Sequence, residues 1–265
     1  MSCPICGEEM SPAFTATVLC KHEAKFDYCK SCGFLNARKP HWLDEAYSSA
    51  ISSTDTGLVM RNIRIAEKLA ALLYFVMGDR GEGRYLDAAG GSGLLTRLMR
   101  DYGFDFYWSD KYCDNLMARG FEFNEDSGPC RAITAFEAME HLEDPVKFIT
   151  DGLSQSKSDT FIFSTVLFEG APPPPDQWWY YALETGQHIG FFQRKTLETI
   201  GKRLGMRFFS AGGLHILTKK NISPLLLRIC VSRASSFFSH LTNKALGGKV
   251  WSDHLLMIDR INNSQ

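Results

Sequence analysis

The stretch Tyr85-Leu-Asp-Ala-Ala-Gly-Gly-Ser-Gly93 decides the fold class, because a short strand pattern runs directly into a glycine-rich turn. A helical pattern, residues 94–101, follows at once. Such a turn offers backbone N–H groups to a ligand and lets the ligand approach the chain closely. It predicts a site for a nucleotide-like cofactor, and the flanking sequence has to identify which one.

Strand and helix patterns alternate on both sides of this turn. An amphipathic helix is expected at 58–77, strands at 84–87, 104–109, 131–136 and 160–165, helices at 94–101, 145–154 and 195–204, and a hairpin at 207–210 and 214–218. Alternation of this kind predicts right-handed crossovers between parallel strands. We therefore expect an α/β fold with a Rossmann-like, mostly parallel seven-stranded sheet and helices on both faces.

Four cysteines near the N-terminus predict a bound metal. They form two pairs with two intervening residues, each followed by a glycine: Cys3, Cys6, Cys29 and Cys32. Two such turns give a tetrahedral set of thiolates suited to zinc, and a closed four-sulfur site is structural rather than catalytic. Iron in a rubredoxin-like site is the alternative. Cys20 and His22 lie between the pairs and are treated as bystanders.

These patterns divide the chain into four segments. Residues 1–40 are expected to form a small zinc-ribbon-like module, 41–57 a linker, 58–220 the cofactor-binding domain, and 221–265 a C-terminal extension with two helical patterns.

Composition limits the function classes. The 265 residues carry a formal net charge of -1, so the general field that draws a protein onto nucleic acid is missing. The longest apolar run, Ala70–Met77, is far too short to span a bilayer. The chain opens on a polar, cysteine-bearing segment instead of a secretory signal, and we expect a cytoplasmic protein without membrane insertion.

Two sequence elements with acidic residues narrow the choice of cofactor. The strand pattern after the turn ends in Asp110, where a carboxylate can accept both hydroxyls of an adenosine ribose. The next strand pattern runs into Glu137-Ala-Met-Glu140-His141-Leu-Glu-Asp-Pro145. Nicotinamide-dependent dehydrogenases use a similar strand, turn and acidic residue, but they lack this last element.

With these three motifs in this order, residues 58–218 resemble the class I S-adenosylmethionine-dependent methyltransferases, in particular those with Glu-His-x-x-x-Pro after the fourth strand. The resemblance implies that Asp87, Gly91 and Gly93 surround the methionine part of the cofactor, that Asp110 holds the ribose, and that Glu137 lies nearby. The chain departs from the family's pattern at one cofactor position, Ala89, which replaces the first glycine.

Alanine is tolerated at position 89 if the turn keeps a negative φ there, and we expect that conformation. Two further residues just before the core, Tyr47 and Arg61, are candidates for the amino-acid end of the cofactor.

The segment Trp178–Phe192 follows the last parallel strand, where this fold places substrate-binding loops. It resembles the acceptor segment of methyltransferases for sugars and polysaccharide precursors, some of which carry an N-terminal zinc module. His188 is the first choice for a general base and His141 the second. Glu184 could orient the imidazole of His188, and Tyr181 could support either group.

The sequence therefore predicts an S-adenosylmethionine-dependent methyltransferase that acts on a sugar nucleotide or a related small metabolite in glycan or natural-product biosynthesis. The alternative is a zinc-ribbon RNA methyltransferase or a noncatalytic RNA-binding adaptor. Five basic residues of the first segment keep that alternative open: Lys21, Lys25, Lys30, Arg38 and Lys39. The methylated atom and the oligomeric state stay open.

Overall fold

The computed structural model describes residues 1–48, 52 and 54–263. They form two compact units: unit 1 contains Met1–Ser52, Ala135–Ser154 and Thr160–Lys220, and unit 2 contains Ser53–Thr134, Gln155–Asp159 and Asn221–Gln265. This division differs from the predicted segments, since residues 1–40 share a unit with the region after residue 135. Of the predicted linker, residues 49–51 and 53 lie outside the described residues.

Unit 2 contains the strands predicted at 84–87 and 104–109 and most of the one predicted at 131–136. Strand β4 (Arg84–Ala88) lies between β5 (Asp105–Ser109) and β6 (Cys130–Ala135) and pairs with both in parallel. The first helix, α2 (Leu58–Ala71), continues into a π-helix, η1 (Leu72–Val76), and buries Ile65, Ala66, Leu69 and Ala70. Helix α3 (Leu94–Asp101) follows the glycine turn, and η2 (Glu125–Ser127) is a short 3₁₀ turn before β6.

In unit 1, the predicted hairpin is present. Strands β9 (Arg207–Ala211) and β10 (Leu214–Thr218) pair antiparallel across Gly212-Gly213, and β10 also pairs antiparallel with β7 (Thr160–Phe163). The strand order of the sheet is β5-β4-β6-β7-β10-β9. The predicted count of seven strands is therefore wrong, since the described part of the chain gives this sheet six.

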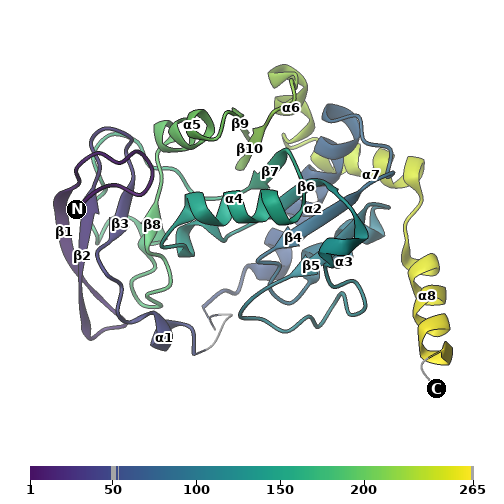
Figure 1. Ribbon diagram of the computed structural model, residues 1–265, viewed down its shortest axis with the longest axis horizontal. Coiled ribbons are helices and arrows are strands. Elements are labelled where there is room, and N and C mark those ends of the chain that lie inside the picture. Colours follow the sequence, from purple (N-terminus) through teal and green to yellow (C-terminus); the bar gives the residue numbers. More distant parts are fainter. Residues whose placement is uncertain (49–51, 53, 264–265) are drawn as a thin grey trace. The chain divides into compact units, whose positions relative to one another are not determined.

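A second, antiparallel sheet contains the N-terminal strands (Figure 1). Its order is β1 (Ser11–Val18), β2 (His22–Tyr28), β3 (Leu35–Ala37) and β8 (Gly190–Phe191). Phe26 and Leu35 of this sheet pack in one apolar core with Trp42, Tyr181 and Phe191. The N-terminal module is thus completed by a strand that lies about 150 residues later in the sequence, which its composition does not reveal.

The remaining elements of unit 1 are helices. They are α1 (Leu43–Ala46), η3 (Met139–His141), α4 (Pro145–Gln155), η4 (Trp179–Tyr181) and α5 (Arg194–Arg203). Helix α5 begins with a capping box, in which the side chains of Gln193 and Thr196 bond to each other's backbone N–H groups.

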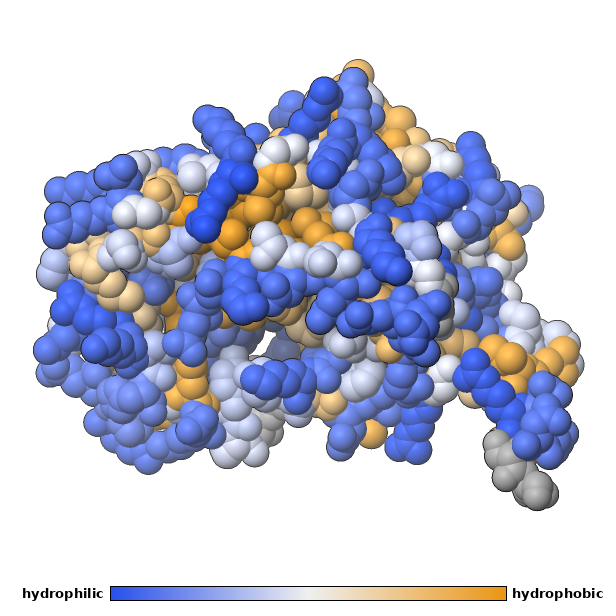
Figure 2. Space-filling model, viewed as in Figure 1, coloured by the Kyte–Doolittle hydropathy of each residue, from blue (hydrophilic) through white to orange (hydrophobic). Residues whose placement is uncertain are grey.

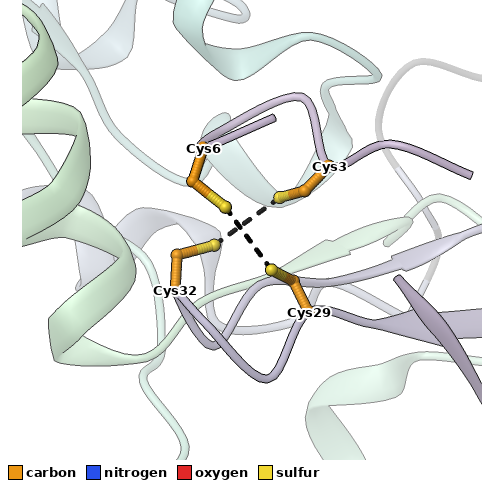
Figure 3. Close-up of side chains that lie close together, drawn as sticks. All are labelled: Cys3, Cys6, Cys29 and Cys32. Carbon is orange, nitrogen blue, oxygen red and sulfur yellow. Dashed lines mark hydrogen bonds between the residues drawn. The ribbon is translucent and has the colours of Figure 1, made fainter. Parts of the chain in front are cut away.

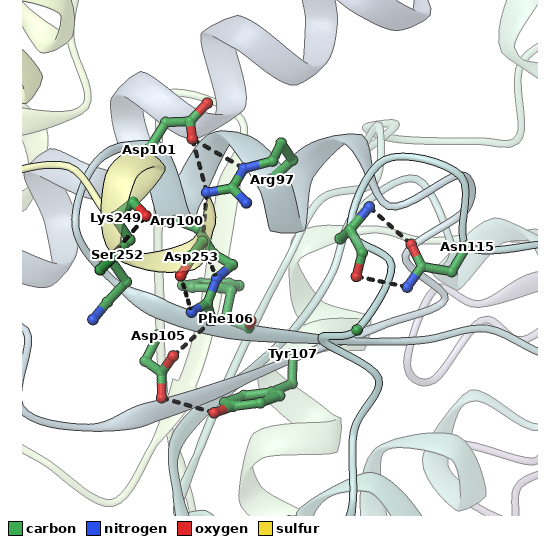
Figure 4. A network of polar contacts seen from close by, with 12 residues as sticks. Arg97, Arg100, Asp101, Asp105, Phe106, Tyr107, Asn115, Lys249, Ser252 and Asp253 are labelled. Atoms are coloured by element: carbon green, nitrogen blue, oxygen red, sulfur yellow. Dashed lines mark hydrogen bonds and ion pairs between the residues drawn. The ribbon is translucent and has the colours of Figure 1, made fainter. Parts of the chain in front are cut away.

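The C-terminal segment forms three helices, one more than predicted: α6 (Pro224–Cys230), α7 (Ser235–Leu246) and α8 (Val250–Asn263). Helix α7 packs against α2. In α8, the buried carboxylate of Asp253 accepts hydrogen bonds from Arg100 Nε, from Arg100 Nη and from Arg97, each at 2.8 Å (Figure 4). Most of the other α8 side chains are exposed, and hydrophobic ones gather over this helix (Figure 2).

None of the helices in the described part of the chain has the length and the apolar character that crossing a membrane requires.

Candidate functional site

In unit 2, Asp87 is a buried residue that holds the start of the glycine turn in place. Its carboxylate accepts hydrogen bonds from the hydroxyls of Thr96 in α3 (2.9 Å) and Thr134 in β6 (3.0 Å). Burial raises the pKa of Asp87 to about 7, although the two hydroxyls counteract that effect. Its contacts therefore link a strand, a neighbouring strand and the helix that follows the turn.

Asp110 closes the turn from the next strand. Its Oδ2 accepts a hydrogen bond from the backbone N–H of Gly91 (2.9 Å), and Oδ1 accepts from the N–H groups of Tyr112 and Cys113. The indole of Trp108 donates to the carbonyl of Gly91 at 2.8 Å. The structure thus joins the turn that contains Gly91 to Asp110, and the Asp110 carboxylate helps to fix the conformation of the turn.

The backbone of the turn has three residues with positive φ. They are Ala89 (54°), Gly91 (55°) and Gly93 (84°). The expectation of a negative φ at Ala89 is wrong, and this alanine adopts a conformation that costs a non-glycine residue about 1–2 kcal/mol. A Cβ atom on Gly91 would meet nothing within 4 Å, whereas one on Gly93 would lie 2.6 Å from Asn115 Oδ1. Gly91 therefore leaves space for a ligand, and Gly93 is needed for packing.

Arg61, another predicted cofactor residue of unit 2, forms an ion pair with Asp55 at 2.7 Å. Its guanidinium therefore already has a carboxylate partner.

In unit 1, the four predicted metal ligands converge (Figure 3). The sulfur atoms of Cys3 and Cys32 lie 3.5 Å apart, as do those of Cys6 and Cys29. Tetrahedral zinc with Zn–S bonds of about 2.3 Å needs sulfurs separated by about 3.8 Å, so the cluster fits the ion closely.

The two cysteine turns have the same backbone geometry. The N–H of Gly7 donates to the carbonyl of Cys3 (2.9 Å), and the N–H of Gly33 donates to the carbonyl of Cys29 (2.8 Å). Both glycines have a positive φ, 82° and 78°, which the turn requires.

Helix α5 holds these turns from outside. Thr196 donates to the carbonyl of Cys32 (2.8 Å), and Arg203 donates to the carbonyls of Pro4 and Ile5. His22, which is not predicted to bind the metal, has its Nε2 atom 3.0 Å from Oε2 of Glu45.

A second polar cluster in unit 1 contains both histidines that the sequence singled out. One nitrogen of His141, one nitrogen of His188 and one carboxylate oxygen of Glu140 lie within 4.8 Å of one another. The two imidazole rings meet edge to face, with centroids 4.8 Å apart. Burial, reinforced by the neighbouring His188, lowers the pKa of His141 to about 3, so this imidazole is neutral at pH 7.

Hydrogen bonds assign the tautomer of each ring. Nδ1 of His188 lies 2.7 Å from the carbonyl oxygen of Tyr180, and Nδ1 of His141 lies 3.1 Å from that of Gln187. A carbonyl can only accept, so both Nδ1 atoms carry the proton and both Nε2 atoms keep a lone pair. Tyr47, predicted at the cofactor, lies with its hydroxyl 3.0 Å from the same Nδ1 of His141.

Glu137 is held in a conformation with φ of 51° where β6 ends. Ser164 donates to its carboxylate at 2.6 Å and accepts from its backbone N–H at 3.0 Å. Ser164 is a partner that the sequence analysis missed, because no motif marks the end of β7.

The remaining predicted catalytic residues differ in exposure. Tyr181 is buried, and its hydroxyl donates to the carbonyl of Pro173 at 2.8 Å. Glu184 is exposed. Of the aromatic run, Tyr180 and Tyr181 belong to the core, whereas Trp179 is 79% exposed. Trp179 is therefore the residue of this run that is free to stack on a ligand.

Glu140 belongs to the Glu-His-x-x-x-Pro motif but is not among the site residues predicted from the sequence. It is completely buried, and neither carboxylate oxygen has a hydrogen-bond partner among the described residues. Its charge contributes, after burial, to raising the pKa of Tyr180, whose hydroxyl lies 3.2 Å from that of Thr165.

Comparison with known proteins gives one family. The model of the family described as "Methyltransferase domain" matches residues 60–210, more than half of the chain. No curated protein matches this sequence.

Several solved structures are similar to the chain. Magnesium protoporphyrin IX methyltransferase (ChlM) from Synechocystis PCC 6803, with bound SAH, has 14% identity and a TM-score of 0.45, covering 67% of this chain and 91% of its own. The plantazolicin methyltransferase BpumL, in complex with SAH, has 9% identity and a TM-score of 0.45, covering 69% and 98%. Similarity of this degree identifies neither a substrate nor reacting residues.

The family match covers strands β4 to β7, the glycine turn and the Glu-His-x-x-x-Pro element, and the chain therefore belongs to the methyltransferase domain family.

Proposed function

We propose that this chain transfers a methyl group from S-adenosylmethionine to a sugar nucleotide or a related small metabolite in glycan or natural-product biosynthesis. The observation that carries the cofactor assignment is the turn between β4 and α3. There, the open space at Gly91 adjoins the carboxylate of Asp110. Asp110 would hold the ribose hydroxyls, and the turn around Ala89, Gly91 and Gly93 would hold the methionine part.

The bound cofactor would supply an electrophilic methyl group on a good leaving group, so the protein mainly has to align the acceptor and take up its proton. His188 is the proposed general base. Its Nδ1–H is fixed on the carbonyl of Tyr180, which leaves Nε2 to take the proton from an acceptor hydroxyl. His141, neutral at pH 7, lies beside it and is the second candidate.

The exposed aromatic side chain of Trp179 supports a sugar or nucleotide acceptor, because it is available to stack on one. In the sequence, Trp179 lies close to His188, the proposed base. Glu184 is exposed and available to bind a hydroxyl. Tyr181 would act only through the backbone that it holds, since its hydroxyl is engaged. Zinc at the four cysteines would stabilise unit 1 without entering the reaction. We also propose a cytoplasmic location, because the two pairs of cysteines with two intervening residues suit a metal site in a reducing compartment better than disulfides.

Calorimetry with S-adenosylhomocysteine tests the cofactor assignment. Asp110→Ala should weaken binding by about 1.5–3 kcal/mol, because two charge-assisted hydrogen bonds are lost. Asp114→Ala, a change of an exposed carboxylate in the same loop, is the control and should bind normally. Tighter binding of a nicotinamide dinucleotide than of S-adenosylhomocysteine would contradict the assignment.

A panel of sugar nucleotides and RNA transcripts, with a methyl-labelled donor, tests the acceptor class. On the true acceptor, His188→Ala should lower turnover about 100-fold while cofactor affinity stays unchanged. His254→Ala, which alters an exposed histidine of α8, is the control. Label transferred to RNA and to no small molecule would replace this function by the RNA methyltransferase alternative.

A further inference from the structure

Glu140 is the least satisfied polar group of unit 1. Its side chain is completely buried, and neither carboxylate oxygen is hydrogen-bonded within the described part of the chain. A buried carboxylate without a partner is strongly unfavourable, and buried charges in proteins are normally paired or bound to a metal. A cation bound beside these oxygens would compensate the buried carboxylate.

Two imidazole rings, those of His141 and His188, lie beside this carboxylate. The hydrogen bonds of His141 and His188 to main-chain carbonyls put the proton of each ring on Nδ1 and leave a lone pair on each Nε2. Histidines that ligate metals usually donate their other ring N–H to a carbonyl or carboxylate, which fixes the ring and its tautomer. Both rings already have this support.

We propose that Glu140, His141 and His188 bind a divalent transition-metal ion through a carboxylate oxygen and the two Nε2 atoms. One nitrogen of each imidazole and one carboxylate oxygen of Glu140 converge within 4.8 Å. Two imidazoles with one carboxylate are the donor set of catalytic zinc sites and of non-haem iron sites, and three protein ligands leave a coordination position open. The four-cysteine cluster, by contrast, is closed.

Binding of the ion does not depend on the proposed methyl transfer. Only the role of the ion in catalysis rests on that proposed function. An ion with an open position would bind the acceptor oxygen and lower its pKa, which is the task assigned above to His188 as a base. With the ion bound, Nε2 of His188 is occupied as a ligand, so the ion would replace His188 as the group that activates the acceptor, and the acceptor proton would pass to solvent. Binding of the ion can be measured without any acceptor.

Metal content is the first test. The chain purified without chelator and supplied with zinc should hold one zinc at the cysteines and a second at the new site, by elemental analysis. His188→Ala should lose the second zinc only, and Cys29→Ser the first only. His254→Ala is the matched control and should keep both. With cobalt as the probe, the second ion should add visible absorption without the thiolate charge-transfer band of the cysteine site.

Glu140→Gln gives an independent test, in which zinc should change which of the two proteins, variant or wild type, unfolds at the higher temperature. In the metal-free protein this variant should unfold at a temperature no lower than the wild type, because the carboxylate that it replaces has no hydrogen bond to lose. With zinc added, the order should reverse, because only the wild-type carboxylate binds the ion fully.

One zinc per chain in both the wild type and His188→Ala would overturn the metal site, and so would equal stabilisation of wild type and Glu140→Gln by zinc. Neither result depends on methyl transfer. Conversely, a chain that binds the second ion but methylates nothing would refute the proposed function alone.

Discussion

The ion pairs of Asp253 provide a direct test of how the C-terminal helix is attached. Replacing Asp253 by alanine removes three hydrogen bonds and the charge opposite Arg100, whose side chain is only 4% exposed. Breaking a buried pair on one side typically destabilises a protein by about 3–5 kcal/mol, because the remaining charge is left without compensation. Arg100 keeps Asp105 at 2.6 Å and the carbonyl of Phe106. Because Arg100 keeps these two partners, we expect Asp253→Ala to lower the free energy of unfolding by about 3 kcal/mol, the lower end of that range.

The pH dependence follows from the same contacts. Although burial opposes it, hydrogen bonds and charge from Arg100 and Arg97 lower the pKa of Asp253. A carboxyl whose pKa is lower in the folded state contributes stability above its unfolded pKa of about 3.9, and this contribution is lost as the pH falls through the folded value. Wild type and Asp253→Ala should thus differ most near neutral pH and converge in acid.

Urea unfolding, followed by circular dichroism, measures the effect. With a slope of about 3 kcal/mol per M, the midpoint of Asp253→Ala should fall by about 1 M. Asp259→Ala removes an exposed carboxylate from the same helix and should leave the midpoint almost unchanged. If the two variants have the same midpoint, or if the Asp253→Ala effect does not shrink in acid, the ion pairs do not hold α8 as described.

Two other perturbations have defined outcomes. Chelating the metal, or replacing Cys29 by serine, should lower the unfolding temperature of unit 1, because a closed site supplies folding energy only. Calorimetry should find the affinity for S-adenosylhomocysteine unchanged. A large loss of that affinity would show that the cysteine cluster also contributes to cofactor binding. Since the folded-state pKa of Asp87, about 7, lies above its unfolded value, ligand-free stability should fall by up to ~4 kcal/mol as the pH rises from about 4 to about 7. Asp87→Asn should lack that slope in urea titrations, and identical slopes would exclude the buried carboxyl as its cause.

Local sequence was sufficient to predict the elements around the cofactor turn. Helix α3 has the predicted bounds, 94–101, and the hairpin turns at Gly212-Gly213 as expected. Both depend on short-range signals, namely apolar periodicity and glycine in a tight turn. The spacing of the cysteines likewise predicts each of the two turns, and the four cysteines converge as expected.

What the sequence did not reveal depends on contacts between distant residues. The pairing of β8 with β3 joins segments separated by about 150 residues, and no local pattern marks a two-residue strand. The aromatic run at 178–181 reads equally well as a ligand platform or as core, and only the packing of Tyr180 and Tyr181 distinguishes them. Glu140 could be identified as a site residue only from the lack of partners around it.

Strand β8 is synthesised long after the cysteines, and this order has a consequence for folding of the nascent chain. All four cysteines have been made once residue 32 is added, but the strand that completes their sheet and the helix that holds their turns end only at residue 203. At about 5–20 residues per second, a ribosome needs roughly 10–30 s to make the intervening chain. During that interval β1, β2 and β3 have been made, but β8 and the helix that holds the cysteine turns have not. Zinc taken up at this stage would protect the nascent chain from oxidation, so metal supply during translation should affect the yield of folded protein more than metal supply afterwards.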